Sequence, residues 1–174
     1  TNGLRLGYFT SQRFGTIFVE NRYVSINPEN ERYYYPWRVL RNLWQLSRYV
    51  PPEKLQFEFA NRIEASLNDA AEAHRDSPQM SFKISWEYLC AVPLLASPLC
   101  WLQPSRLPAE ARAAVRGVMD LHHRIAPELR TAFTFPIGEE PSGRGWTGFW
   151  SARPDLPHTG LVQVFREHND RAEA

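Results

Sequence analysis

The chain has 174 residues, 20 basic and 19 acidic side chains, and a formal net charge of +1. This balance produces no large positive field for a polyanion, so we expect no nucleic-acid partner. The length suffices for one ordinary domain, or for a small domain attached to part of another. We expect no membrane span either, because Pro93, Ser97 and Pro98 interrupt the most apolar stretch, residues 88–102.

The first predicted strands lead to a group of polar residues. Residues 4–10 and 14–19 each have the aromatic and β-branched content of a strand, the second more clearly. In parallel α/β folds, the carboxyl ends of the strands carry the chemistry. The second strand delivers a carboxylate, an amide, a guanidinium and a phenol to such an end: Glu20, Asn21, Arg22 and Tyr23.

Glu20 is the candidate catalytic residue of this segment. A carboxylate at a strand end can act as a general acid or base where burial or a neighbouring charge adjusts its pKa. Arg22 lies close enough in sequence to pair with it. The alternative, which these residues alone favour, is a salt bridge at the rim without a catalytic role.

Aromatic residues surround the start of the first predicted helix, residues 36–49, which begins at a proline and is stopped by two more. Aromatic rings beside an arginine can stack on a sugar and bond its hydroxyl groups. Tyr35, Trp37 and Arg38 are therefore candidate substrate-binding residues. The alternative is that Tyr35 and Trp37 only fix the helix to the sheet, whereas Trp44 is expected in the core.

The middle of the chain, up to about residue 130, is predicted to continue the α/β region. Residues 52–63 favour a helix because a proline starts them, although Leu55, Phe57 and Phe59 alternate as in a strand. We expect a short strand over residues 81–85 and a buried helix over residues 86–95. The clearest helix spans residues 107–129, where Pro127 is expected to shorten or bend it.

After residue 130 the pattern changes to turns and short strands. Residues 132–137 and 161–166 indicate strands, and residues 138–148 indicate a tight turn entering a β-hairpin. Three aromatic residues of this hairpin are expected to pack inward: Trp146, Phe149 and Trp150. The glycine-rich turn is neither a P-loop nor a dinucleotide fingerprint, since the Lys-Ser/Thr pair and a following long helix are missing.

Neither the cysteines nor the histidines predict a metal site. Cys90 and Cys100 lie in apolar sequence and indicate buried, inert thiols, with a disulfide or a metal pair as the alternative. His122 and His123 are adjacent in a predicted helix, so their side chains point to different faces and cannot chelate one ion. We expect no metal and no other cofactor, and we assign His168 no role.

Four segments follow one another along the chain: GTIFVENRY (15–23), YPWRVLRNLWQLSRYVPP (35–52), FPIGEEPSGRGWTGF (135–149) and VFREHNDR (164–171). Together they resemble the C-terminal part of melibiase-like glycoside hydrolases, the α-galactosidase clan. The resemblance implies an α/β fold in which residues 1–130 are the last βα units of a TIM-type (β/α)8 catalytic barrel. Residues 131–174 would be the start of an antiparallel β-sandwich domain.

The resemblance also implies where the catalytic groups lie. In this clan the nucleophilic aspartate comes from an earlier barrel strand, upstream of this chain, and the acid/base is an aspartate at the end of a later strand. The matching segment, residues 19–27, contains no aspartate, so Glu20 is the carboxylate available at that position. Retaining glycoside hydrolysis needs two carboxyl groups about 5 Å apart, and one candidate cannot complete the pair.

We therefore expect a fragment of a glycosidase that hydrolyses α-galactoside-type bonds and is inactive as an isolated chain. A barrel needs about 250 residues, more than the whole chain provides. The expected partners are a carbohydrate substrate and a missing N-terminal barrel half or partner chain. Two alternatives stay open: a non-catalytic carbohydrate-binding module, and a protein-interaction domain.

Overall fold

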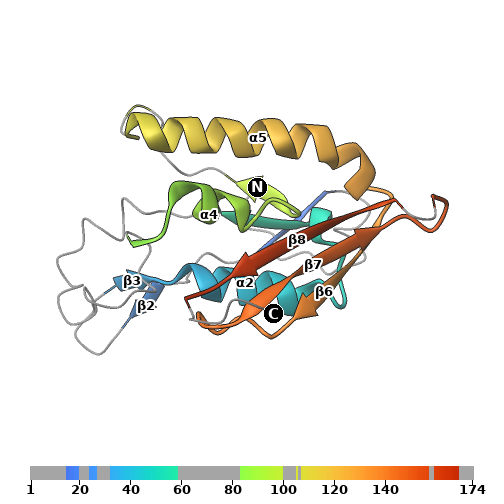
Figure 1. The fold of residues 1–174 in the computed structure, drawn as a ribbon, viewed down its shortest axis with the longest axis horizontal. Coiled ribbons are helices and arrows are strands. Elements are labelled where there is room, and N and C mark those ends of the chain that lie inside the picture. The colour runs from blue at the N-terminus through green and yellow to red at the C-terminus, as the bar shows by residue number, and fades with distance from the viewer. Residues whose placement is uncertain are drawn as a thin grey trace.

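The computed structural model describes residues 15–19, 24–26, 32–58, 83–99, 105, 107–156 and 159–168. Three predictions fall outside this part of the chain: the strand over residues 4–10, the polar residues Glu20 to Tyr23, and the burial of Cys100. Within it, a small parallel sheet and three α-helices lie beside a three-stranded antiparallel sheet (Figure 1). The described part is thus a mixture of helices and strands, with both kinds of sheet.

The parallel sheet has the strand order β1-β4-β5, with β1 at Ile17–Phe18, β4 at Leu55–Glu58 and β5 at Ser97–Leu99. In the chain, helix α2 (Pro36–Leu46) comes between β1 and β4, and helix α4 (Trp86–Ala91) comes between β4 and β5. Strand, helix and parallel strand in succession form the repeating unit of α/β folds. The partial (β/α)8 barrel stays a prediction.

A short antiparallel hairpin lies in the connection between β1 and α2. Its strands are β2 (Val24–Ile26) and β3 (Arg32–Tyr34), and Val24 is opposite Tyr34 in the register. This hairpin brings the chain from the carboxyl end of β1 to the first turn of α2.

The prediction of a helix over residues 52–63 is wrong for residues 52–58, the part of this range that the structure describes. The chain forms a 3₁₀ helix, η1 (Pro52–Lys54), and then strand β4, in which Leu55 and Phe57 are buried. β4 is the central strand of its sheet, paired with β1 on one side and β5 on the other. Pairing with distant strands decides the conformation, because β propensity depends strongly on tertiary context.

Helix α2 is confirmed, although it ends at Leu46, earlier than predicted. Its buried residues recur every three or four positions, as the core-facing side of a helix requires: Val39, Leu40, Leu43 and Trp44. Ser47 follows the last turn, where its N–H donates to the Leu43 carbonyl at 2.9 Å and its hydroxyl to the Trp44 carbonyl at 2.9 Å. These bonds satisfy carbonyl groups that a helix end leaves without partners.

The strand predicted over residues 81–85 is wrong at residues 83–85, the positions that the structure describes. Ser85 is instead the N-cap of α4, and its hydroxyl accepts the N–H of Tyr88 at 3.2 Å. The predicted buried helix ends at Ala91, and the turns that follow keep Val92, Leu94 and Leu95 in the core.

Helix α5 (Ala109–Leu129) is the longest helix of the described residues and lies along the top of the view in Figure 1. Pro127 does not shorten it, because this residue lies in the last turn and the helix continues to Leu129. The Nδ1 atom of His122 lies 2.9 Å from the Leu94 carbonyl oxygen, which joins α5 to the turn after α4. His122 therefore has a structural role at this helix contact.

The strands predicted after residue 130 are confirmed. β6 (Phe133–Gly138), β7 (Trp146–Ala152) and β8 (Gly160–Arg166) form an antiparallel sheet in chain order. Phe149 and Phe165, from β7 and β8, belong to the same buried cluster as Leu40 and Leu89 of the helices. The antiparallel sheet and the helices thus share one hydrophobic core.

The prediction that Trp150 packs inward is wrong. Phe149 is fully buried, whereas Trp150 is 46% exposed and Trp146 is half-buried. Successive side chains of a strand point to opposite faces of the sheet. When Phe149 enters the core, Trp150 must face away from it.

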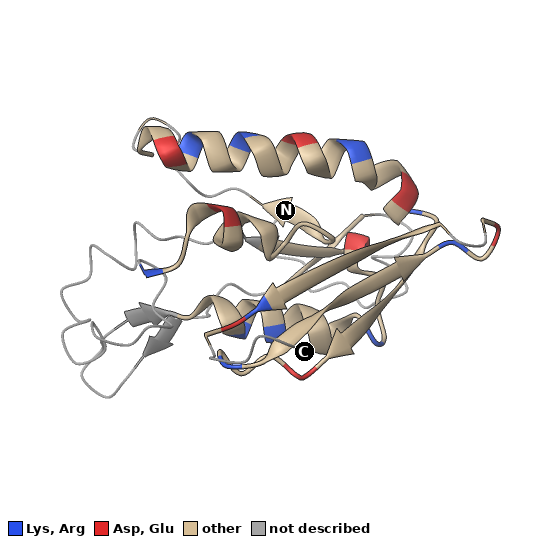
Figure 2. Cartoon of the chain, viewed as in Figure 1, with Lys and Arg blue, Asp and Glu red and all other residues tan. Residues whose placement is uncertain are grey.

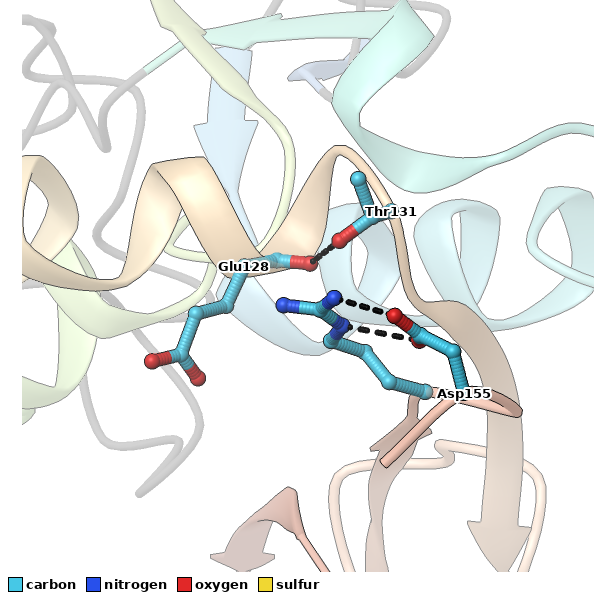
Figure 3. Close-up of polar contacts among 4 residues, drawn as sticks. Glu128, Thr131 and Asp155 are labelled. Atoms are coloured by element: carbon cyan, nitrogen blue, oxygen red, sulfur yellow. Dashed lines mark hydrogen bonds and ion pairs between the residues drawn. The ribbon is translucent and has the colours of Figure 1, made fainter. Parts of the chain in front are cut away.

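The end of α5 lies near the turn that joins β7 to β8 (Figure 3). The Thr131 hydroxyl donates to the Glu128 carbonyl oxygen at 3.1 Å. In the turn, the Arg153 guanidinium donates two hydrogen bonds to the Asp155 carboxylate, one of them at 3.1 Å. These bonds raise the pKa of Arg153, with a smaller contribution from the Glu128 charge, and lower the pKa of Asp155.

Candidate functional site

A pocket of about 200 Å³ lies between the first turn of α2, the start of α4 and the end of β8. In the chain, α2 follows the carboxyl end of β1 and α4 follows the carboxyl end of β4. Open α/β sheets bind their ligands at this edge. Aromatic and charged side chains line the pocket, together with one isoleucine and one glycine: Trp37, Lys83, Ile84, Tyr88, Gly143, Arg166, Glu167 and His168.

Trp37 is held by two cations and a second aromatic ring. The Arg41 and Arg38 guanidinium groups lie 4.8 Å and 5.4 Å from the centre of its ring, and the Tyr35 ring lies 6.3 Å away. Arg38 also lies 5.3 Å from the centre of the Tyr35 ring. The indole N–H of Trp37 is buried and has no hydrogen-bond partner in the described part of the chain.

A fixed turn forms the opposite wall of the pocket. The buried Glu167 carboxylate accepts the backbone N–H groups of Ser142 at 3.1 Å and Gly145 at 2.8 Å. In return, the Glu167 N–H donates to the Gly145 carbonyl, and the His168 N–H donates to the Gly143 carbonyl. Gly143 has a φ of +86°, a left-handed conformation that favours glycine. Five residues of the turn and the end of β8 therefore hold one another in place.

Tyr88 brings a neutral phenol to the pocket. Its ring and the Phe165 ring pack edge to face, with centroids 5.3 Å apart and planes at 73°. Burial, followed by the negative charge of Glu167, raises the pKa of Tyr88 above its ordinary value of 10.0. The phenol therefore stays protonated at neutral pH, where it can donate or accept a hydrogen bond but cannot act as a base.

Three basic side chains complete the lining of the pocket: Lys83, Arg166 and His168. The Arg166 guanidinium lies 5.8 Å from the centre of the Trp146 ring. Ring faces, a phenol and charged donors around a small volume suit a polar ligand that has both a flat apolar face and hydroxyl groups.

Of the residues predicted from the sequence, Trp37 lines the pocket, and Tyr35 and Arg38 contact Trp37. Tyr35 is buried, which favours the alternative that it fixes the helix. Glu20, Asn21, Arg22 and Tyr23 lie outside the described residues. The Val19 N–H donates to the Gln56 carbonyl at 3.1 Å, so the pairing of β1 with β4 continues to the residue before Glu20.

Sequence reasoning missed most of the pocket. Lys83 and Tyr88 come from the segment that was predicted as a strand and a helix, and Arg166, Glu167 and His168 come from the end of the last strand. The last three repeat the pattern seen at Glu20, a predicted strand that ends in charged and polar residues. That signal was present in the sequence and could have identified them.

The described residues include no group of three or more His, Cys, Asp or Glu side chains that could hold a metal ion. None of the helices that the structure describes combines the length and the apolar character needed to cross a bilayer. Comparison of the chain with protein-family models, curated proteins and solved structures gave no match.

Proposed function

We propose that this chain binds a carbohydrate in the pocket beside Trp37, as the C-terminal part of a glycoside hydrolase of the α-galactosidase type. The observation that supports the proposal most is the pocket itself, in which an indole and a phenol face charged donors on a fixed turn. Sugars have apolar ring faces that stack on aromatic side chains and hydroxyl groups that bond polar ones. The resemblance of the sequence to α-galactosidases indicates the same class of ligand.

The size of the pocket favours a single sugar ring. Ligand pockets for drug-sized molecules have roughly 300–1,000 Å³, whereas this pocket has about 200 Å³. The Trp37 ring would offer an apolar surface to the sugar, and the neutral Tyr88 phenol would exchange a hydrogen bond with one of its hydroxyl groups. Arg38 and Tyr35 would act by orienting the Trp37 ring.

In the proposed hydrolase, Glu20 is the general acid/base at the carboxyl end of β1. Asn21, Arg22 and Tyr23 would shape the sugar site beside it. The reaction needs a second carboxylate as the nucleophile. A preceding barrel segment or a partner chain must supply that group, and the isolated chain is expected to bind sugar without cleaving it.

Binding can be tested by saturation-transfer NMR and calorimetry with methyl α-galactoside. We expect Trp37→Ala to weaken binding at least about tenfold, equivalent to 1.4 kcal/mol. Trp150→Ala is the matched control, because it removes the same side chain from a different face of the molecule. Arg166→Ala gives a second test should Trp37→Ala disturb α2. No binding by the native chain, or equal losses in Trp37→Ala and Trp150→Ala, would contradict the sugar pocket.

Catalysis needs a separate test, in which the chain is joined to or mixed with a barrel segment that carries a nucleophile. Hydrolysis of an aryl α-galactoside should then fall about 10²–10⁴-fold in Glu20→Gln, the usual contribution of a general acid/base. Full activity of Glu20→Gln would remove Glu20 from the mechanism while leaving the sugar pocket untouched.

The second candidate function is a non-catalytic carbohydrate-binding module. One observation favours it: the carboxylate that lines the pocket, Glu167, is bound to the N–H groups of Ser142 and Gly145, which suits an anchor better than a catalyst. This function predicts sugar binding that depends on Trp37 and not on Glu20, and no hydrolysis in any combination with a barrel segment.

A further inference from the structure

The face of the β6–β8 sheet that points away from the helices exposes a group of large apolar side chains. We call it the apolar face, and five residues define it: Phe133, Phe135, Trp150, Val162 and Val164. Their exposed fractions are 61%, 49%, 46%, 61% and 53%. About half of each of these residues therefore meets solvent.

The strand register makes this face continuous. Phe135, Trp150 and Val162 stand directly opposite one another across the three strands, and the Phe135 and Trp150 ring centroids are 6.0 Å apart. Ile137, Gly148 and Val164 form the next row. Cross-strand neighbours of this kind share one side of the sheet, so the exposed residues form a single patch.

The opposite face, which packs against the helices, carries the polar residues of the sheet. The hydroxyl groups of Thr134 and Ser151 bond each other at 2.7 Å, and the Gln163 amide donates to the Ala91 carbonyl at 2.8 Å. Thr147 is also buried on this side. A sheet with one wet face normally turns its polar residues to the water. Here they point inward, which indicates that the outer face is covered too.

The charges on the sheet limit what can cover it. Across β6, β7 and β8 the one charged residue is Arg166, at the end of β8, and the ribbons of these strands are otherwise without charge in Figure 2. Permanent homodimer interfaces are more apolar than interfaces that form and dissociate. Arg166 lies at the edge of the apolar face, beside Trp146. A face with one charge at its edge offers little for the recognition of a charged foreign partner, whereas the apolar parts of two copies match each other.

The exposed apolar area is also comparable to a substantial part of a protein–protein interface. With about 150–250 Å² for a whole aromatic side chain, the half-exposed rings and the two valines offer on the order of 400–500 Å². The largest apolar patch of an ordinary monomer has roughly 300–600 Å², and each side of a standard interface buries about 800 Å². The half-buried neighbours Ile137, Trp146 and Ala152, with the strand backbones, can supply the remainder.

We propose that the apolar face binds the same face of a second copy of this chain, in a two-fold symmetric sheet-on-sheet dimer. A two-fold interface uses the same patch on both copies, so the patch need only be complementary to itself. Two twisted sheets pack in this way about 10 Å apart, with the side chains of the two faces interdigitating. The inference stands on the apolar face alone and does not depend on the sugar pocket.

The test is sedimentation velocity of the whole chain from about 1 to 100 µM, a range that detects micromolar dissociation constants. We expect a species of twice the 20.2 kDa chain mass. Val162→Lys and Val164→Lys should each raise the dimer dissociation constant at least about tenfold, because the new charge is buried without a partner. Tyr49→Lys, at a residue that is 79% exposed and lies after α2, is the control and should leave dimerisation unchanged.

Far-UV circular dichroism of each variant establishes that the fold is intact, which is expected because the substituted side chains are already exposed. A native chain that stays monomeric throughout the range would overturn the proposal. A dimer that survives both lysine substitutions would overturn it as well, since it must use another surface. Binding of a different protein by a monomeric chain counts against the dimer in the same way.

Discussion

The indole N–H of Trp44 in helix α2 donates a hydrogen bond to the carbonyl oxygen of Ile137 in strand β6, at 3.2 Å. The two residues lie far apart in the sequence, in the parts that were predicted as α/β and as all-β. Trp44 also belongs to the shared core, so this partly buried bond joins the two parts at the margin of that core.

Trp44→Phe is therefore expected to lower the free energy of unfolding by about 1–2 kcal/mol. The loss combines one hydrogen bond, worth about 0.5–1.5 kcal/mol, with the carbonyl that it leaves without this donor. Gln45→Ala is the control, because it removes an exposed bond between the same two regions, from the Gln45 amide to Glu140 at 2.8 Å. Its expected cost is below about 0.5 kcal/mol, and urea unfolding of both variants measures the difference.

Glu167→Ala should destabilise the chain by about 1–3 kcal/mol, since it leaves the buried N–H of Gly145 and the partly buried N–H of Ser142 without their acceptor. Glu167→Gln keeps an oxygen in the same place and should cost less. Chemical denaturation gives the two free energies. Equal costs for Ala and Gln would mean that the carboxylate oxygen does not hold the turn.

Gly148→Ala should destabilise the protein by about 1–3 kcal/mol, the usual cost of forcing an extra methyl group into a close-packed site. A Cβ atom at this position would overlap the carbonyl oxygen of Gln163 in the neighbouring strand. Gly117→Ala is the matched control, because a Cβ there meets nothing within 4 Å and the residue lies inside helix α5. That change should raise stability by about 0.5–1 kcal/mol.

Deprotonation of the Glu53 carboxyl group should lower the free energy of unfolding as pH rises. Burial raises its pKa above the ordinary value of 4.5, against smaller opposing effects of a backbone hydrogen bond and of Lys54. The folded state therefore holds the proton more tightly than the unfolded state. This contribution is fully present below pH 4.5 and is lost as pH rises through the higher folded-state pKa.

Glu53→Gln removes that titration, so its urea midpoint should exceed that of the native chain at neutral pH and the two should approach each other in acid. A difference that is the same at both pH values would show that the substitution acts through packing and not through the carboxyl charge.

Local sequence patterns predicted the elements whose conformation depends mainly on their own residues and not on distant ones. The periodicity of helix α5 and the three- and four-residue spacing of the apolar residues in α2 are of this kind. Strand β4 is not, because its pairing with β1 and β5 overrides a helical start at Pro52. Ser85 shows the same limit, since its role as a helix cap depends on where α4 begins.

The site was less predictable than the fold. Trp37 could be chosen because aromatic residues cluster around it in the sequence, but Tyr88 and Arg166 come from distant segments. The charged end of β8 could be noticed in the sequence, but nothing there shows that it lies beside Tyr88. The pocket exists because α4 and β8 pack together through contacts such as that of Tyr88 with Phe165. Such proximity is a property of the tertiary structure that periodicity does not encode.

Phe149 and Phe165 lie in the same buried cluster as Leu40 and Leu89. Removing the antiparallel sheet would uncover the helices, and removing the helices would uncover the inner face of the sheet. The described regions are thus thermodynamically coupled, and heating should melt them in one cooperative transition with equal calorimetric and van't Hoff enthalpies. A protein cut between α5 and β6 should yield two pieces that fold only when mixed.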